Sequence, residues 1–221
     1  MLHCRFAPIR RRAVAILSSL VIASALATSI AAALIAAAAC ADPTPGFLES
    51  WPGTGLDGWS GGAQYVNPGV GGALGAADGF LRMSTATVAN LASTSSAPAY
   101  TGNWTAAGVT RVQVWLDDVD AHQSLEIHFM IGSGATSWVY TPGFTPPDHA
   151  WAEFTVDLTA TASFTRITGT GTLDQVLQAV DKIQFRHDLA PFVQAPDPIQ
   201  ADVGIDELLL TTAPSATSAT T

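Results

Sequence analysis

Tryptophan, carboxylate, amide and basic side chains alternate with apolar residues along several short segments of the chain. Successive side chains of a strand point to opposite faces, and a tryptophan on a solvated sheet face is costly unless something covers it. A sugar ring can lie on an aromatic plane while its hydroxyls meet carboxylate, amide, guanidinium and imidazole groups. The pattern therefore predicts a carbohydrate-binding surface formed by Arg111, Gln113, Trp115, Glu126, His128, Trp151, Glu153, Gln184 and Arg186.

Two other readings of this surface stay open at the level of sequence. A loop could cover the tryptophans, in which case they would serve packing rather than binding. The strands could also divide between two sheets, so that the residues need not form one patch.

The best catalytic pair is Glu126 with Glu153, because glycoside hydrolysis uses two carboxyl groups that flank the scissile bond. The sequence has no HExxH zinc motif, no GxSxG motif and no phosphate-binding glycine signature. The four histidines after residue 42 also lack the spacing of metal ligands. We expect a protein that binds without catalysis, with a polysaccharide-active enzyme as the alternative.

Many short strands must position these side chains. The clearest alternating segments are 79–85, 109–118, 124–132, 149–158, 182–187 and 203–210. Turns rich in Gly, Pro and Asp separate them, which predicts an all-β sandwich or barrel. Thr172 and Gln175 form a capping-box pattern before an apolar run, which predicts one short helix near 172–180.

Charge excludes several classes of partner. From Asp42 onward the chain carries five basic and 18 acidic residues, a net charge of −13 with histidine neutral. A field of that sign repels nucleic-acid phosphates and anionic lipids, whereas it tolerates neutral ligands and favours divalent cations. We therefore expect no nucleic-acid partner.

The first 41 residues have the layout of an export signal, with Arg10–Arg12 before a long uncharged run. Cleavage after Ala41 would leave no cysteine in the mature chain, whereas lipidation of Cys40 would give a lipoprotein. The run is also long enough for an uncleaved membrane anchor. We expect an extracellular or cell-envelope protein that touches the membrane only through such an anchor or lipid, and a disordered Ser/Thr-rich tail at 213–221.

The order of several motifs resembles bacterial secreted jelly-roll modules, similar to laminin domain IV and to galactose-binding-like carbohydrate-binding modules. The motifs are FLESWPGTGLDGWS at 47–60, APAYTGNWT at 97–105 and GIDELLL at 204–210. The resemblance implies a galactose-binding-like jelly-roll β-sandwich that covers residues 42–212. It also implies one structural calcium ion, held by Glu49 and Asp206.

We therefore predict a non-catalytic, exported carbohydrate-binding module of the cell envelope, with a polysaccharide or glycan as its partner and calcium as a structural cofactor. A laminin-like protein–protein or adhesion module is the alternative from another class. A shallow groove favours a sugar, whereas a flat apolar patch with a charged rim favours a protein partner.

Overall fold

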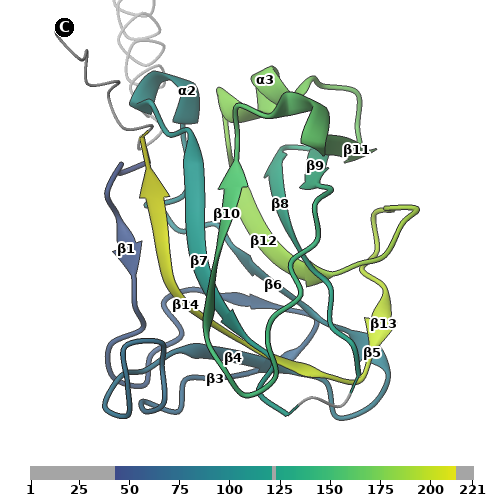
Figure 1. Cartoon of the computed structure of the whole chain (residues 1–221). Helices are drawn as coiled ribbons and strands as arrows, with labels where there is room; N and C mark the ends of the chain where they lie inside the picture. Colours follow the sequence, from purple (N-terminus) through teal and green to yellow (C-terminus); the bar gives the residue numbers. More distant parts are fainter. Residues whose placement is uncertain (1–42, 121–122, 213–221) are drawn as a thin grey trace, which may run out of the picture. The chain divides into compact units, whose positions relative to one another are not determined.

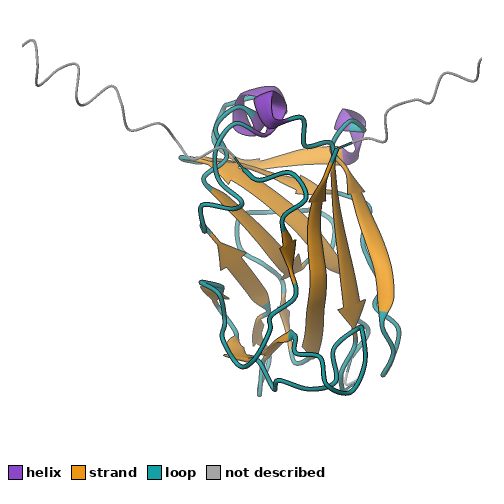
Figure 2. Cartoon of the chain, turned by 90° about the vertical axis from the view of Figure 1, so that its left-hand side faces the viewer, coloured by secondary structure: helices purple, strands orange, loops and turns teal. Residues whose placement is uncertain are grey.

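Two antiparallel β-sheets pack face to face in the computed structural model, which describes residues 43–120 and 123–212 (Figures 1 and 2). The predictions of a signal segment at 1–41, of lipidation at Cys40 and of a tail at 213–221 lie outside the described residues. The all-β sandwich predicted from the alternating segments is confirmed.

The first sheet, sheet A, has the strand order β10-β7-β14-β4-β3, and β1 also pairs with β14. Its members are β1 (Leu48–Glu49), β3 (Gln64–Val66), β4 (Leu81–Ser84), β7 (Arg111–Asp117), β10 (Ala152–Asp157) and β14 (Asp202–Thr211). The last strand of the described residues thus lies at the centre of the sheet, between strands from the first half of the described region.

The second sheet, sheet B, has the order β11-β9-β8-β12-β6-β2. Its members are β2 (Ser60–Gly61), β6 (Ala92–Ser95), β8 (Ile127–Ser133), β9 (Thr136–Tyr140), β11 (Phe164–Thr168) and β12 (Lys182–His187). A small two-stranded sheet pairs β5 (Ala89–Asn90) with β13 (Pro198–Ile199).

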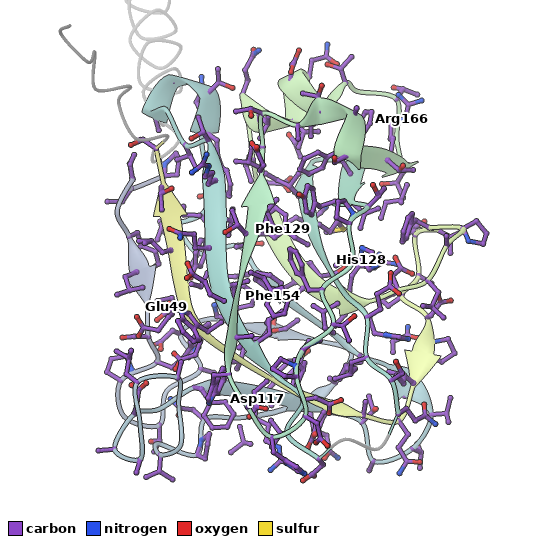
Figure 3. All side chains as sticks on the ribbon, in the orientation of Figure 1. Glu49, Asp117, His128, Phe129, Phe154 and Arg166 are labelled. Carbon is purple, nitrogen blue, oxygen red and sulfur yellow. The ribbon has the colours of Figure 1, made fainter. Side chains whose placement is uncertain are left out.

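The core lies between sheets A and B. It is formed by the side chains that the alternating pattern of each strand predicted to face inward. Phe129 of β8 and Phe154 of β10 lie between the two layers (Figure 3). Each fully buried aliphatic or aromatic side chain contributes roughly 1.5–3 kcal/mol relative to exposure. The fully buried residues that the alternation placed on the apolar faces include Val112, Val114, Leu116, Ile127, Phe129, Ile131, Val156, Ile183, Phe185, Val203 and Ile205.

Helix α3 (Leu173–Leu177) forms where the capping box predicts it. The Thr172 side chain accepts a hydrogen bond from the Gln175 backbone N–H, and the Gln175 side chain accepts one from the Thr172 N–H. Two short helical turns, α2 (Trp104–Ala107) and η1 (Thr161–Ser163), were not predicted. No helix in the described part of the chain is long and apolar enough to cross a membrane.

A β-bulge interrupts β14 at the Asp206–Glu207 pair. The pairing register with β7 shifts between Asp206 and Leu209, and Glu207 has φ = 47°. The extra residue lets Asp206 stay on the outer face of sheet A, while Ile205 and Leu208 both remain fully buried. The two adjacent carboxylates in this apolar run are thus accommodated by the bulge.

Candidate functional site

The predicted carbohydrate-binding residues divide between two surfaces. The strand register places Arg111, Gln113, Trp115 and Glu153 on the outer face of sheet A, and Trp151 lies above the same face. Glu126, His128, Gln184 and Arg186 belong instead to the side of sheet B. The structure therefore does not bring the nine residues into one patch.

Trp151 is a packing residue on sheet A. Its ring meets Phe80 edge to face, with centroids 5.2 Å apart. A Cβ atom built on Gly204 of β14 would lie 2.7 Å from the Trp151 ring, so the indole rests directly on that strand. Its Nε1–H donates to the Gly71 carbonyl at 3.1 Å. This half-buried tryptophan therefore packs against β14 and the 67–79 loop.

The remaining outer face of sheet A is polar. Gln113 Nε2 donates to Glu153 Oε1 at 2.6 Å, and Trp115, which is half-buried, pairs across the strands with Glu153 and Asp206. A hollow of about 180 Å³ opens at one end of this sheet, beside Arg82. The Arg82 guanidinium is already bound by the carboxylates of Asp202 and Asp120, which neutralise it.

Two of the predicted sugar contacts, His128 and Arg186, are fully buried, because the 188–197 loop folds over that half of sheet B. Arg186 donates to the carbonyls of Val193 and Gln194 at 2.9 and 3.0 Å and forms an ion pair with Asp188 at 2.8 Å. Strand alternation places both side chains outward correctly, but it cannot show that a distant loop closes over them.

His128 is enclosed in the same way. Its Nδ1–H donates to the Tyr140 carbonyl at 2.8 Å, and its Nε2 lies 3.0 Å from Glu126 Oε1 (Figure 3 labels His128). The Phe192 ring lies against the imidazole, with centroids 4.8 Å apart. These contacts make His128 and Arg186 supports of the loop rather than ligand-contacting residues.

The other half of the outer face of sheet B is open and forms a groove of about 460 Å³. The register places Thr94 of β6, Gln184 of β12 and Met130 of β8 in one row across the three strands. Gln184 Nε2 donates to Thr94 Oγ1 at 2.8 Å, which orients both side chains. The residues that define the groove, here called the sheet B groove, include Thr94, Met130, Ser137, Lys182, Gln184 and Gln194.

The 188–197 loop supplies one wall of the sheet B groove through Gln194. Arg186, in the covered half of sheet B, donates to the Gln194 carbonyl. It thereby holds Gln194 in place as a wall of the groove in the open half. Of the nine predicted residues only Gln184 lines the groove. The parity of β12 could also have indicated Lys182, whereas Thr94, Ser137 and Gln194 come from segments without an interpretable motif.

Glu126 and Glu153 are not a catalytic pair in this arrangement. Glu126 contacts His128 on sheet B, whereas Glu153 accepts from Gln113 on the outer face of sheet A. A glycosidase needs its two carboxyl groups on either side of one bond, about 5–10 Å apart. Carboxylates on the two opposite sheets do not flank a common cleft.

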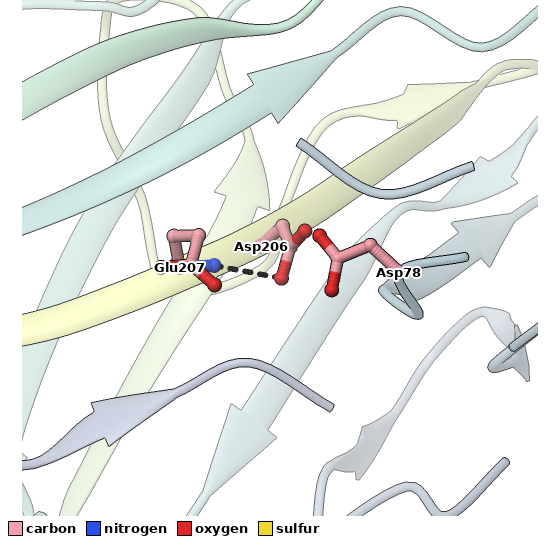
Figure 4. Close-up of side chains that lie close together, drawn as sticks. All are labelled: Asp78, Asp206 and Glu207. Carbon is pink, nitrogen blue, oxygen red and sulfur yellow. Dashed lines mark hydrogen bonds between the residues drawn. The ribbon is translucent and has the colours of Figure 1, made fainter. Parts of the chain in front are cut away.

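Three carboxylates gather where the loop after β3 meets β14. Potential ligand oxygens of Asp78, Asp206 and Glu207 all lie within 4.8 Å of one another (Figure 4). Asp206 is fully buried and accepts from the backbone N–H groups of Ala73 and Glu207, each at 2.8 Å. Burial, together with the nearby Asp78, raises the pKa of Asp206 to about 7.

The predicted calcium pair of Glu49 and Asp206 is not the arrangement that the structure contains. Glu49, which Figure 3 labels, is buried. The Tyr100 O–H donates to Glu49 Oε2 at 3.5 Å. Burial and the charge of Asp57 raise the pKa of Glu49 to about 7. Asp206 has Asp78 and Glu207 as its carboxylate neighbours instead, because the bulge and the 67–79 loop bring these residues together.

No protein-family model matches the sequence, and no curated protein matches it significantly. A family 11 carbohydrate-binding module from Clostridium thermocellum, solved with a β-1,3-1,4-mixed-linked tetrasaccharide, matches with a TM-score of 0.52 and 19% identity over 76% of this chain and 95% of its own. The fold is an antiparallel β-sandwich similar to that of this module.

Two further solved structures match over a comparable share of this chain. The family 11 module of the Clostridium thermocellum cellulase Lic26A-Cel5E has a TM-score of 0.49 and 18% identity over 77% of this chain and 97% of its own. An exo-β-agarase has a TM-score of 0.53 and 10% identity over 77% of this chain but 25% of its own. The resemblance to laminin domain IV stays a prediction.

Proposed function

We propose that this protein is a non-catalytic polysaccharide-binding module that takes its ligand in the sheet B groove. The observation that carries the proposal is an open groove of about 460 Å³ with hydroxyl, amide and ammonium groups presented by paired strands. This volume is within the range of small-molecule sites, about 300–1,000 Å³. Strands hold such groups more rigidly than loops do, and rigid presentation lowers the cost of binding.

The glycan class rests on chemistry and on the fold together. Thr94, Ser137, Gln184 and Gln194 offer both donors and acceptors, as a ligand covered with hydroxyl groups requires. A module with a similar fold was solved with a β-1,3-1,4-mixed-linked tetrasaccharide, so mixed-linkage β-glucan is the first neutral polymer to test. The export-signal pattern at 1–41 supports a location outside the cytoplasm.

Replacing Gln184 by Ala should weaken polysaccharide binding about tenfold, because several hydrogen bonds contributing about 1 kcal/mol each depend on its position. Affinity electrophoresis against a polysaccharide panel measures the change. The matched control is Gln113→Ala, the same chemical change on the outer face of sheet A. Loss of binding in Trp115→Ala with full binding in Gln184→Ala would move the site to sheet A.

We also propose that Asp78, Asp206 and Glu207 hold a structural calcium ion. Two oxygens bound to one Ca²⁺ lie at most about 5 Å apart, and the three carboxylates satisfy that limit. The Oε1 atom of Glu207 is buried without a hydrogen-bond partner among the described residues, so a cation would satisfy it. The ion would tie the 67–79 loop to β14, in a fold whose mature chain has no disulfide if Cys40 is removed.

Millimolar calcium should therefore raise the melting temperature of the protein by several degrees over the value in chelator, since a ligand that binds only the folded state stabilises it. Asp78→Asn should abolish most of the increase, because it removes one of the three charged ligands of the cluster. Asp57→Asn, which removes a carboxylate near Glu49 instead, serves as the control. An equal calcium effect in Asp78→Asn and in the unmodified protein would contradict this assignment.

A further inference from the structure

We propose that the polysaccharide bound in the sheet B groove carries an anionic substituent, a uronate carboxylate or a sulfate ester, and that Lys182 binds it. This inference rests on the proposed function and specifies its ligand. The charge of the groove is opposite in sign to that of the chain as a whole. The chain from Asp42 onward has 18 acidic residues, yet none of the described residues that line the groove is acidic, whereas the sole lysine of the sequence is among them.

The ammonium group of Lys182 is held in place by its surroundings. Its aliphatic stem crosses Gly132 on the neighbouring strand, where a Cβ atom would lie 2.5 Å from Lys182 Cε and 3.0 Å from Cγ. Its Nζ donates to the Gly134 carbonyl at 3.2 Å. Glycine at position 132 thus makes room for the stem, which directs the charge into the groove.

Lys182 keeps donor capacity for a ligand. An ammonium group has three N–H donors, and the structure uses one of them on Gly134. The adjacent Asp181 carboxylate forms an ion pair with Lys182 at 3.9 Å, which is beyond hydrogen-bond distance and so uses none of the N–H donors, and its Oδ2 accepts from the Gly134 N–H at 2.6 Å. The side chain of Lys182 is 30% exposed, so an anion can reach it.

The other groups that line the groove explain why a charged contact matters here. No aromatic ring is among the described residues that line it, so stacking on a sugar ring cannot supply the affinity. Hydrogen bonds to charged groups are roughly twice as strong as neutral ones. Apart from Asp181, which lies beside Lys182 but is not among the residues that line the groove, the acidic residues would repel an anionic polymer from a greater distance, and physiological salt screens charges beyond about 8 Å. Lys182 would touch the anionic group directly, so salt would screen this attraction less than the repulsion from distant carboxylates.

The test uses matched polymers and the chain as it accumulates after export from a bacterial host. Polygalacturonate is compared with its carboxyl-reduced form, and a sulfated galactan with its desulfated form, in 0.15 M salt by isothermal titration and affinity electrophoresis. We expect one charged polymer to bind about fivefold more tightly than its neutral partner, the upper range for a partly exposed ion pair. The polymer that shows the preference identifies carboxylate or sulfate as the recognised group.

Lys182→Gln should abolish that preference, Lys182→Arg should retain it, and Arg111→Gln, which removes one exposed positive charge on sheet A, should leave it unchanged. Unfolding curves of the variants confirm that each is folded. Equal or tighter binding of both neutral polymers would overturn the inference while the proposed function stands. Absence of binding to all four polymers and to mixed-linkage β-glucan would overturn both.

Discussion

Replacing Arg186 by Met should lower the free energy of unfolding by roughly 3–5 kcal/mol, the cost of removing one partner of a buried ion pair. The Arg186 and Asp188 side chains are 1% and 0% exposed. Burial raises the pKa of Asp188 to about 6 even though Arg186 acts to lower it. Without the guanidinium, a buried carboxylate and the carbonyls of Val193 and Gln194 would lose their partner.

Urea unfolding followed by tryptophan fluorescence measures this change, and polysaccharide binding should fall with it because the Gln194 wall of the groove loses its support. The double variant Arg186→Met/Asp188→Leu should recover most of the lost stability, since it removes both buried charges together. Arg111→Met, the loss of an exposed arginine, should change stability by no more than about 0.5 kcal/mol. A cost below about 1 kcal/mol for Arg186→Met would show that the loop does not depend on this pair.

Stability in the presence of a chelator should fall between about pH 4 and pH 7, in contrast to the common case of carboxylates that stabilise a fold when ionised. Burial raises the pKa values of Glu49 and Asp206 to about 7 in the folded protein. A group with a raised folded-state pKa binds its proton more tightly when folded. Its stabilising contribution is complete below the unfolded-state pKa near 4 and is lost as the pH rises through 7.

Each of the two groups should contribute on the order of 2–4 kcal/mol to this loss. Urea midpoints measured at intervals from pH 4 to pH 8 would record it. Glu49→Gln should remove one part of the pH dependence without changing the response to calcium. Asp206→Asn should remove another part and also abolish the calcium response, because calcium binds the ionised form and would offset the loss in the unmodified protein.

A flat stability profile from pH 4 to pH 8 in chelator would contradict the burial of these two carboxylates. A Glu49→Gln variant that loses calcium stabilisation while Asp78→Asn retains it would return the metal site to the pair expected from the sequence. The two variants therefore distinguish the proposed calcium site at Asp78, Asp206 and Glu207 from the buried Glu49 beside Tyr100.

The strands and their buried faces could be predicted because they depend on local sequence. Val112, Val114 and Leu116 alternate with polar residues, and the chain can bury them only by placing one face of that strand against another layer. The helix after Thr172 was predictable for the same reason, since a capping box acts within four residues. The apolar run at 203–210 predicted the terminal strand, but nothing in the sequence predicted the bulge at Glu207.

The proposed binding surface could be predicted only in part. Gln184 was identified because its strand alternates clearly, and it does line the groove. Trp151, His128 and Arg186 were assigned to a ligand, yet they hold loops against the outer faces of the sheets. Outward orientation is a property of one strand, whereas exposure depends on every other segment that packs above it.

The sequence by itself determined the class of fold, the acidic character of the chain and the side chains on each strand face, because periodicity and composition are properties of neighbouring residues. Only the tertiary structure decided which of those faces stays open and which carboxylate lies beside Asp206. The residues that meet at these two sites are 90 or more positions apart in the chain: Asp78 and Asp206 in the carboxylate cluster, and Thr94 and Gln184 in the sheet B groove. Their proximity comes from strand order and loop paths, which no local pattern encodes.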